Sequence, residues 1–214
     1  GQDYDIYAAR VSTSGEILDP DGFPVCTAPE DQEYSFIAFD GTHYLVAWQD
    51  RRNDPNNADI YCARVDTSGN VLDPDGFPVS TAPEHEWQPR AAFDGTHYLI
   101  TWHTSPYSDI YGARVDTSGN VLDPEGIPIC TAVEHQMGPS VAFDGTRYLV
   151  VWYDYRNGSD SDIYGTFVDT SGIVSDTLGF PICTQDSFQN HPSVAFDGTN
   201  YLVAWNDDRA EPVG

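Results

Sequence analysis

Pairs of carboxylates two residues apart recur in the sequence, each followed directly by a glycine in the motif Leu-Asp-Pro-Asp/Glu-Gly. Hard cations such as Ca²⁺ prefer clustered carboxylate and carbonyl oxygens on a bent loop. A longer acidic loop offers the same ligand types, although neither loop has the full spacing of an EF-hand. Ca²⁺ is therefore a candidate cofactor, with ordinary turn chemistry as the alternative. The candidate ligands are Asp19, Asp21, Asp73, Asp75, Asp123, Glu125, Asp154 and Asp160.

A second pattern, Trp-x-Asp-x-Arg, occurs three times, and a fourth copy has Thr104 and Pro106 in place of the Asp and the Arg. Because residues two apart on a strand share a face, the Asp and the Arg can form an ion pair beside the Trp. A ladder of structural ion pairs is the favoured interpretation. The alternative is a carbohydrate site in which sugars stack on Trp48, Trp102, Trp152 and Trp205.

The other reactive residue types form no catalytic pattern. The six histidines lack the spacing of a zinc site, and no glycine-rich phosphate loop occurs. A glycosidase would need a pair of carboxylates unique to one repeat. Glu86, Glu134 and Asp186 are unique in this way, but nothing in the sequence favours them. We therefore expect a protein that is not an enzyme.

The elements that carry these residues come from an internal repeat. The phrase Phe-Asp-Gly-Thr starts at Phe39, Phe93, Phe143 and Phe196, and Asp-Ile-Tyr recurs at the same intervals of 54, 50 and 53 residues. Asp-Gly-Thr suits a hairpin turn in which the Asp bonds its own backbone. The apolar segment after it predicts a strand buried on both faces. A period near 50 residues with four strands is typical of a propeller blade.

The sequence thus predicts an all-β fold, a β-propeller of four four-stranded blades of ~50 residues in a single domain, 1–214. The chain starts at the third strand of one unit and stops after the second strand of another, so the two ends would form one composite blade. That blade could close a ring of four, join two chains into a ring of eight blades, or link chains into a filament. The expected units are 1–34 (partial), 35–88, 89–138, 139–191 and 192–214 (partial).

Three of the four cysteines occupy equivalent positions of different repeats, which normally lie too far apart for a disulfide within one molecule. Cys62 has no such equivalent. The only pairing that merits a test is Cys26 with Cys62, and buried free thiols are the alternative.

The formal net charge is −25, and all nine basic residues are arginines. Such a surface repels nucleic acids and anionic membranes, and no apolar run is long enough to span a bilayer. We therefore expect no nucleic-acid partner and no membrane insertion. Cations, neutral polymers such as glycans, and basic proteins remain as partners, and salt or bound cations would screen the self-repulsion.

Two segments carry a resemblance to known proteins: DIYGARVDTSGNVLDP, from Asp109, and PSVAFDGTRYLVVW, from Pro139. They resemble tandem β-propeller-like repeats of large secreted and cell-surface proteins of bacteria and archaea, and the resemblance covers nearly the whole chain. It implies an extracellular or cell-surface location. It implies no defined activity, because such repeats serve as binding, adhesion or spacer modules.

Two functions remain open at this point. The favoured one is a non-enzymatic extracellular repeat protein that acts as a structural, self-assembling or adhesion scaffold. Its partner would be another copy of the chain, joined head to tail by strand complementation. The alternative is a carbohydrate-binding, lectin-like propeller module whose partners are surface glycans.

Overall fold

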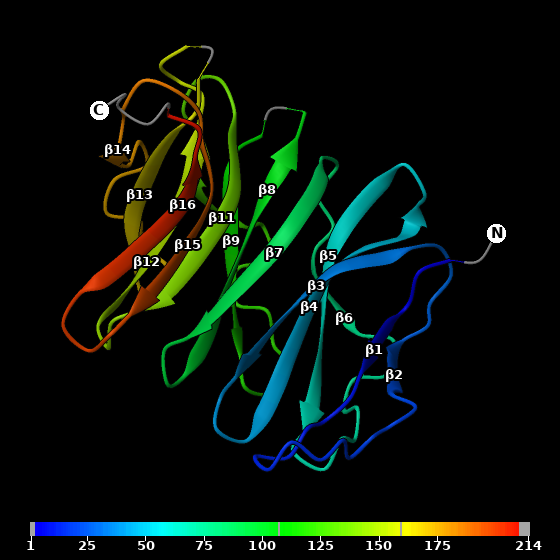
Figure 1. The fold of residues 1–214 in the computed structure, drawn as a ribbon. Helices are drawn as coiled ribbons and strands as arrows, with labels where there is room; N and C mark the ends of the chain where they lie inside the picture. Colours follow the sequence, from blue (N-terminus) through cyan, green and yellow to red (C-terminus); the bar gives the residue numbers. More distant parts are fainter. Residues whose placement is uncertain (1–2, 107, 159, 210–214) are drawn as a thin grey trace.

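Antiparallel β-sheets make up the computed structural model, which describes residues 3–106, 108–158 and 160–209; no helix occurs in these ranges. Three sheets have four strands each, and neighbouring strands in a sheet are consecutive in the sequence. A two-stranded sheet precedes them and another follows, and Figure 1 shows the five sheets arranged as a fan. No described helix could cross a membrane.

We call the four-stranded sheets blades 1, 2 and 3, and the two-stranded sheets half-blades. Blade 1 comprises β3 (Gln32–Phe39), β4 (His43–Asp54), β5 (Asn57–Asp66) and β6 (Phe77–Ser80). Blade 2 comprises β7 (His85–Phe93), β8 (His97–Ser105), β9 (Ile110–Asp116) and β10 (Ile127–Cys130). Blade 3 comprises β11 (Gln136–Phe143), β12 (Arg147–Asp154), β13 (Asp162–Asp169) and β14 (Phe180–Cys183). The N-terminal half-blade is β1 (Ile6–Ala8) with β2 (Phe23–Cys26), and the C-terminal one is β15 (Gln189–Phe196) with β16 (Tyr201–Asp207).

The hairpin between the first two strands of each repeat forms as predicted. In blade 1, Asp40 Oδ1 accepts hydrogen bonds from the N–H groups of Thr42 and His43, both at 2.6 Å. Gly41 has a φ of 96°, a backbone conformation that side-chain-bearing residues rarely adopt. The Asx-turn interpretation is therefore confirmed, and the same bonds recur at Asp94, Asp144 and Asp197.

The second strand of each complete blade is apolar at consecutive positions because both of its faces are covered. In β4, Leu45 and Ala47 pack into the core between blades 1 and 2. Val46 and Trp48 pack into the core between blade 1 and the N-terminal half-blade. The hydrophobic core is thus divided into layers between facing sheets, as in stacked propeller blades.

An arginine in three of the repeats joins its own sheet to the next one. Arg64 donates hydrogen bonds from Nε and Nη2 to both oxygens of Asp73, each at 2.8 Å. Its Nη1 donates to the carbonyl oxygen of Thr117, in the following blade, at 3.1 Å. We call this arrangement the arginine clamp. It recurs as Arg10–Asp19 with Thr67 and as Arg114–Asp123 with Thr170.

The all-β fold with repeated four-stranded antiparallel sheets is confirmed, but the two half-blades do not join within one chain. β1 pairs with β2 and β15 with β16, as two separate sheets. Figure 1 shows them at opposite ends of the fan. Each half-blade packs against a different complete blade, β1–β2 against blade 1 and β15–β16 against blade 3. The composite blade of a four-bladed ring is therefore not assembled inside this chain.

The prediction of a disulfide between Cys26 and Cys62 is wrong, since all four cysteines are free thiols. Cys26 lies in the core layer between the N-terminal half-blade and blade 1, whereas Cys62 lies in the layer between blades 1 and 2. The sheet of blade 1 separates the two sulfur atoms. Burial raises the pKa of the Cys62 thiol well above its ordinary value, which keeps the group protonated and unreactive.

Candidate functional site in the second blade

Blades 1 and 3 show what the Trp-x-Asp-x-Arg pattern builds when it is complete. Trp48 Nε1 donates to Asp50 Oδ2 at 2.7 Å, and Arg52 Nη2 donates to the same oxygen at 2.6 Å. The Arg52 guanidinium lies over the ring of Tyr61, 4.2 Å from its centre. Because Asp50 is fully buried, this ion pair is a structural one, as predicted. Blade 3 repeats the arrangement with Trp152, Asp154, Arg156 and Tyr164.

The predicted stacking of sugars on the tryptophan that recurs in each repeat is not supported in the complete blades. The side chains of Trp48, Trp102 and Trp152 are at most 1% exposed, so none presents a ring face to a sugar in solution. They are buried because the preceding sheet packs over the strand that carries them. Trp205, on β16 of the C-terminal half-blade, is partly exposed.

The predicted calcium loops do not gather a set of ligands. The first carboxylate of each motif belongs to an arginine clamp, and hydrogen bonds from Arg10 lower the pKa of Asp19 to about 2. Asp154 is held by Trp152 and Arg156. The remaining four lie exposed on turns or loops: Asp21, Asp75, Glu125 and Asp160. In residues 3–106, 108–158 and 160–209, no three acidic, His or Cys side chains come together as a metal site would require. Among the described residues, these loops therefore bring no cluster of carboxylates together.

Blade 2 and the strand before it depart from the repeat at several neighbouring positions. Thr104 replaces the buried Asp and Pro106 replaces the Arg. Ser80 stands where other repeats have Cys26, Cys130 and Cys183, and Glu86 stands where they have Gln32, Gln136 and Gln189. Glu86 and Thr104 face each other across β7 and β8, as Gln32 faces Asp50 and Gln136 faces Asp154. In blades 1 and 3 the acidic residue of this pair is on the second strand, whereas in blade 2 it is on the first strand.

Glu86 is a buried carboxyl group, 1% exposed, and no basic side chain pairs with it in the part of the chain that the structure describes. Its Oε1 accepts a hydrogen bond from Ser80 Oγ at 2.6 Å, and its Oε2 accepts one from the N–H of Ile60 at 3.2 Å. Burial is the main cause that raises the pKa of Glu86 to about 8. A carboxyl group in this state can bind a cation or exchange a proton near neutral pH.

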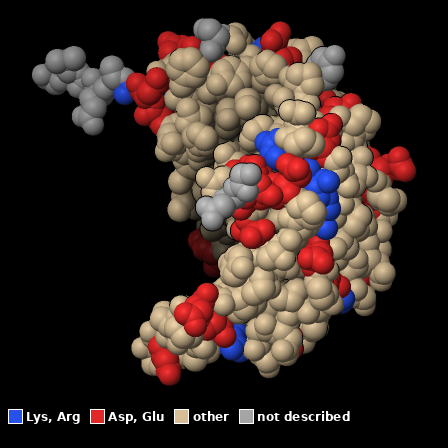
Figure 2. All heavy atoms as spheres, turned by 90° about the vertical axis from the view of Figure 1, so that its right-hand side faces the viewer, with Lys and Arg blue, Asp and Glu red and all other residues tan. Residues whose placement is uncertain are grey.

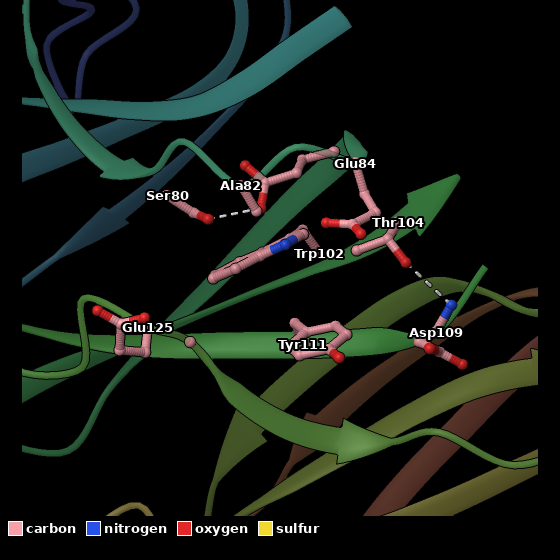
Figure 3. A pocket seen from close by; sticks show the side chains of 10 residues that line it. Ser80, Ala82, Glu84, Trp102, Thr104, Asp109, Tyr111 and Glu125 are labelled. Carbon is pink, nitrogen blue, oxygen red and sulfur yellow. Dashed lines mark hydrogen bonds between the residues drawn. The ribbon is translucent and has the colours of Figure 1, made fainter. Parts of the chain in front are cut away.

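A pocket of about 200 Å³ lies beside Glu86 and is bounded by aromatic rings and carboxylates. Figure 3 shows the rings of Trp102 and Tyr111 one above the other, with Glu125 at one end and Thr104 and Asp109 at the other. Glu84, Glu86, Ser80 and Ala82 complete the wall together with Gly126, whose φ of 74° favours glycine.

The indole N–H of Trp102 makes no hydrogen bond of ordinary geometry, although Trp102 is only 1% exposed and lines this pocket. It still interacts with the Glu86 carboxyl group, because that contact lowers the pKa of Glu86 and so opposes part of the effect of burial. In blades 1 and 3 the same N–H donates to the Asp that Thr104 replaces. The hydroxyl of Thr104 instead accepts a bond from the N–H of Asp109, at 3.2 Å. Burial raises the pKa of Asp109, so that carboxyl group is also poorly compensated. The pocket is therefore a polar site whose internal partners are incomplete.

Sequence reasoning identified Glu86 as unique to one repeat but did not select it. Its signal lies in the comparison of repeats, because Glu86, Ser80, Thr104 and Pro106 all depart from the pattern and all belong to one neighbourhood. Glu134 and Asp186, the other two carboxylates considered from the sequence, do not line this pocket, and Glu134 has counterparts in Glu30 and Glu84.

Comparisons with known proteins agree on the architecture. No protein-family profile matches the chain, and no curated protein sequence is significantly similar to it. Among solved structures, a putative glycoside hydrolase from Bacteroides ovatus has a TM-score of 0.58 at 11% identity, over 96% of this chain and 67% of that one. A thermostable family-43 glycoside hydrolase gives 0.57 at 15%, over 83% and 66%. An alpha-L-arabinofuranosidase from Clostridium thermocellum gives 0.54 at 14%, over 83% and 62%.

The fold is that of a β-propeller. At these identities the likeness shows the fold and no activity. The chain spans 66% and 62% of the length of the family-43 enzyme and the arabinofuranosidase. The family-43 propellers have five blades.

Proposed function

We propose that this chain is a non-enzymatic extracellular scaffold in which the half-blades of neighbouring copies complete each other by strand pairing. The observation that carries the proposal is the exposure of apolar side chains on both half-blades. Leu202 on β16 is 74% exposed, whereas its equivalents Leu45 and Leu99 are fully buried. Tyr7 on β1 is 58% exposed, whereas its equivalent Tyr61 is 7% exposed. A second copy would cover both surfaces.

The register of the complete blades indicates how two copies would meet. The Trp of the second strand pairs with the Tyr of the third strand in all three blades, as in Trp48 with Tyr61. Trp205 of one copy would accordingly face Tyr7 of the next, and Tyr201 would face Val11. This pairing supplies the two strands that each half-blade lacks, by the same β-strand addition that other proteins use to bind extended segments.

The free edge of β16 has hydrogen-bonding groups available for this pairing. The turn bond from the N–H of Asp197 to the carbonyl of Asn200, at 3.1 Å, sets the alternation of the β15–β16 ladder. Because hydrogen-bonded and non-hydrogen-bonded pairs alternate along the ladder, the backbone N–H and C=O of Leu202 point toward β15. Those of Val203 point away from β15, toward the free edge. Val203 is therefore a position where the free edge can be blocked without loss of a β15 bond.

Sedimentation velocity of the wild type, Val203→Pro and Val203→Thr tests the proposal. Proline removes the N–H at the free edge and is tolerated on an edge strand, whereas threonine keeps the N–H. We expect concentration-dependent assemblies of the wild type and of Val203→Thr, and monomers of Val203→Pro with unchanged circular dichroism. A monomeric wild type at high concentration, or equal assembly of all three, would falsify the scaffold.

The acidic surface supports an extracellular setting as part of this proposal, together with the resemblance to secreted repeats. Figure 2, viewed from the side of β1 and β2, shows carboxylates in several patches, with arginine side chains next to some of them. Eight of the nine arginines form ion pairs with carboxylates: Arg10, Arg51, Arg52, Arg64, Arg114, Arg147, Arg156 and Arg209.

A further inference from the structure

One guanidinium group fills the same space in blades 1 and 3, and blade 3 shows its contacts most fully. Arg156 Nη2 donates to Asp154 Oδ2 at 2.5 Å, and Nη1 donates to the carbonyl oxygen of Leu178 at 2.6 Å. The Sγ of Cys130 lies 3.4 Å from Nη2, and the ring of Tyr164 lies under the guanidinium at 4.1 Å. The group is therefore bound by a carboxylate, a carbonyl, a sulfur and an aromatic face.

Each of these contacts has a counterpart around the pocket of blade 2. Tyr111 occupies the position of Tyr164, Ser80 that of Cys130, and Glu125 that of Leu178, and all three line the pocket. The arginine itself has no counterpart, because Pro106 stands in its place and carries no cation, and Thr104 stands in place of Asp154.

The carboxylate of the set is also retained in space, although it comes from another strand. In blade 3, Gln136 Nε2 lies 3.5 Å from Asp154 Oδ1, so the two side chains end next to each other. Glu86 stands at the position of Gln136 and lines the pocket. A carboxyl group thus remains beside the place that the guanidinium occupies in the other blades.

We propose that the pocket between Trp102 and Tyr111 binds a guanidinium group from outside the chain, of the kind that an arginine side chain carries. A planar cation can stack on Tyr111 while its N–H groups reach Glu86 and the Glu125 segment in different directions. Glu84 and Asp109 add negative charge to the wall, and the net charge of −25 attracts a basic ligand over longer distances. The inference does not rest on assembly, since a monomer contains the whole pocket.

Isothermal titration calorimetry at pH 8.5 with four probes tests the ligand. Nα-acetyl-arginine-N-methylamide represents an arginine within a polypeptide, and free arginine represents a small metabolite. The corresponding capped lysine carries a positive charge on a head group of a different shape. The capped citrulline has a planar head group of similar shape but no charge. We expect the capped arginine to bind at least about tenfold more tightly than either control, because a charged, planar donor makes contacts that they lack. Equal affinity for citrulline or lysine would overturn the proposal, whereas tighter binding of free arginine would support it and identify a small-molecule source.

Two variants locate the binding. Glu86→Gln restores the residue of the other repeats, so it is expected to fold and to weaken capped-arginine binding at least about tenfold. The triple variant E86Q/T104D/P106R rebuilds the blade 1 pattern, and its own arginine should fill the pocket and abolish binding. Glu134→Gln is the matched control, since it removes one exposed glutamate from the loop between blades 2 and 3 and should leave the affinity unchanged. Unaltered binding by both pocket variants would place the ligand elsewhere and overturn the assignment.

Discussion

Glu86 is the residue at which the repeat pattern and the local environment disagree most. A glutamine at this position donates from Nε2 to two loop carbonyls in other repeats, as Gln32 does to Pro29 and Glu30. A carboxylate cannot donate, so Glu86 relies on Ser80 and on the N–H of Ile60. Its protonated form is favoured because the buried charge lacks a cation.

This protonation predicts a pH dependence of stability that Glu86→Gln removes. The pKa of Glu86 is raised from 4.5 to about 8 by burial, so the folded state holds one more proton than the unfolded state between these values. The resulting stability is complete below pH 4.5 and is lost as the pH rises to about 8. The free energy of unfolding should fall by at most about 1.4 kcal/mol per pH unit in this window, relative to Glu86→Gln. Urea denaturation of both proteins at each pH checks this, and parallel pH curves would contradict it.

The same group predicts how guanidinium binding responds to pH. A bound cation favours the ionised form of Glu86, so the affinity for Nα-acetyl-arginine-N-methylamide should rise from pH 6 to pH 9 and level off above the pKa of about 8. Below that pKa the slope approaches about tenfold per pH unit. Calorimetry in buffers of different ionisation enthalpy should also detect proton release. A flat profile would contradict the role of Glu86. The other groups near it are Asp59, Ser80, Glu84, Trp102, Asp109, Tyr111 and Glu125.

At the scale of elements, hairpins and doubly buried strands could be predicted from the sequence because their causes are local. Asp40 and Gly41 form their turn with adjacent backbone groups. The segment from Tyr44 to Trp48 is apolar at every position, which by itself predicts a strand buried on both faces. The role of the Leu-Asp-Pro loop could not be predicted in this way. Its Asp73 is bound by Arg64, nine residues earlier, and only the pairing of β5 with the returning loop brings them together.

Loss of a clamp carboxylate should destabilise the fold, whereas loss of its neighbour should not. Asp73→Asn leaves the partly buried Arg64 guanidinium without its ion pair, and we expect the free energy of unfolding to fall by about 1–3 kcal/mol. Asp75→Asn removes an exposed charge from the same turn and should change the stability little. Denaturant unfolding measures both. Because neither side chain belongs to a metal site, a chelator should not alter either result, and a chelator-induced loss of stability would restore the calcium hypothesis.

At the scale of the whole molecule, the period and strand count of the repeat identified the propeller blade but not the closure of a ring. Closure depends on the angle between neighbouring sheets, and each layer between two sheets is built from residues of both, as Leu45 and Trp102 are in the layer between blades 1 and 2. No single repeat encodes that angle. The pocket of blade 2 was missed for a related reason, because its walls come from β6, the following loop, β7, β8, β9 and the loop before β10.

The charge of the molecule predicts that assembly strengthens with salt. Two copies that each carry −25 repel each other, whereas the proposed contact itself buries apolar side chains and backbone groups. Raising the ionic strength from about 0.01 M to about 1 M shortens the Debye length from about 30 Å to about 3 Å and removes most of the repulsion. Sedimentation velocity across this range should show larger assemblies at high salt. Assemblies that dissolve at high salt would indicate a contact held by ion pairs instead.

The arginine clamp stops before the last sheet, and this has a mechanical consequence. Arg10, Arg64 and Arg114 each tie a sheet to the one after it, but blade 3 has Phe167 at the corresponding position. The C-terminal half-blade is fastened by side-chain packing and by bonds such as that from the Tyr201 hydroxyl to the Arg147 carbonyl. Under tension applied to both ends, the chain should therefore begin to peel at β15–β16, so an array of such molecules would carry a weak link of fixed polarity.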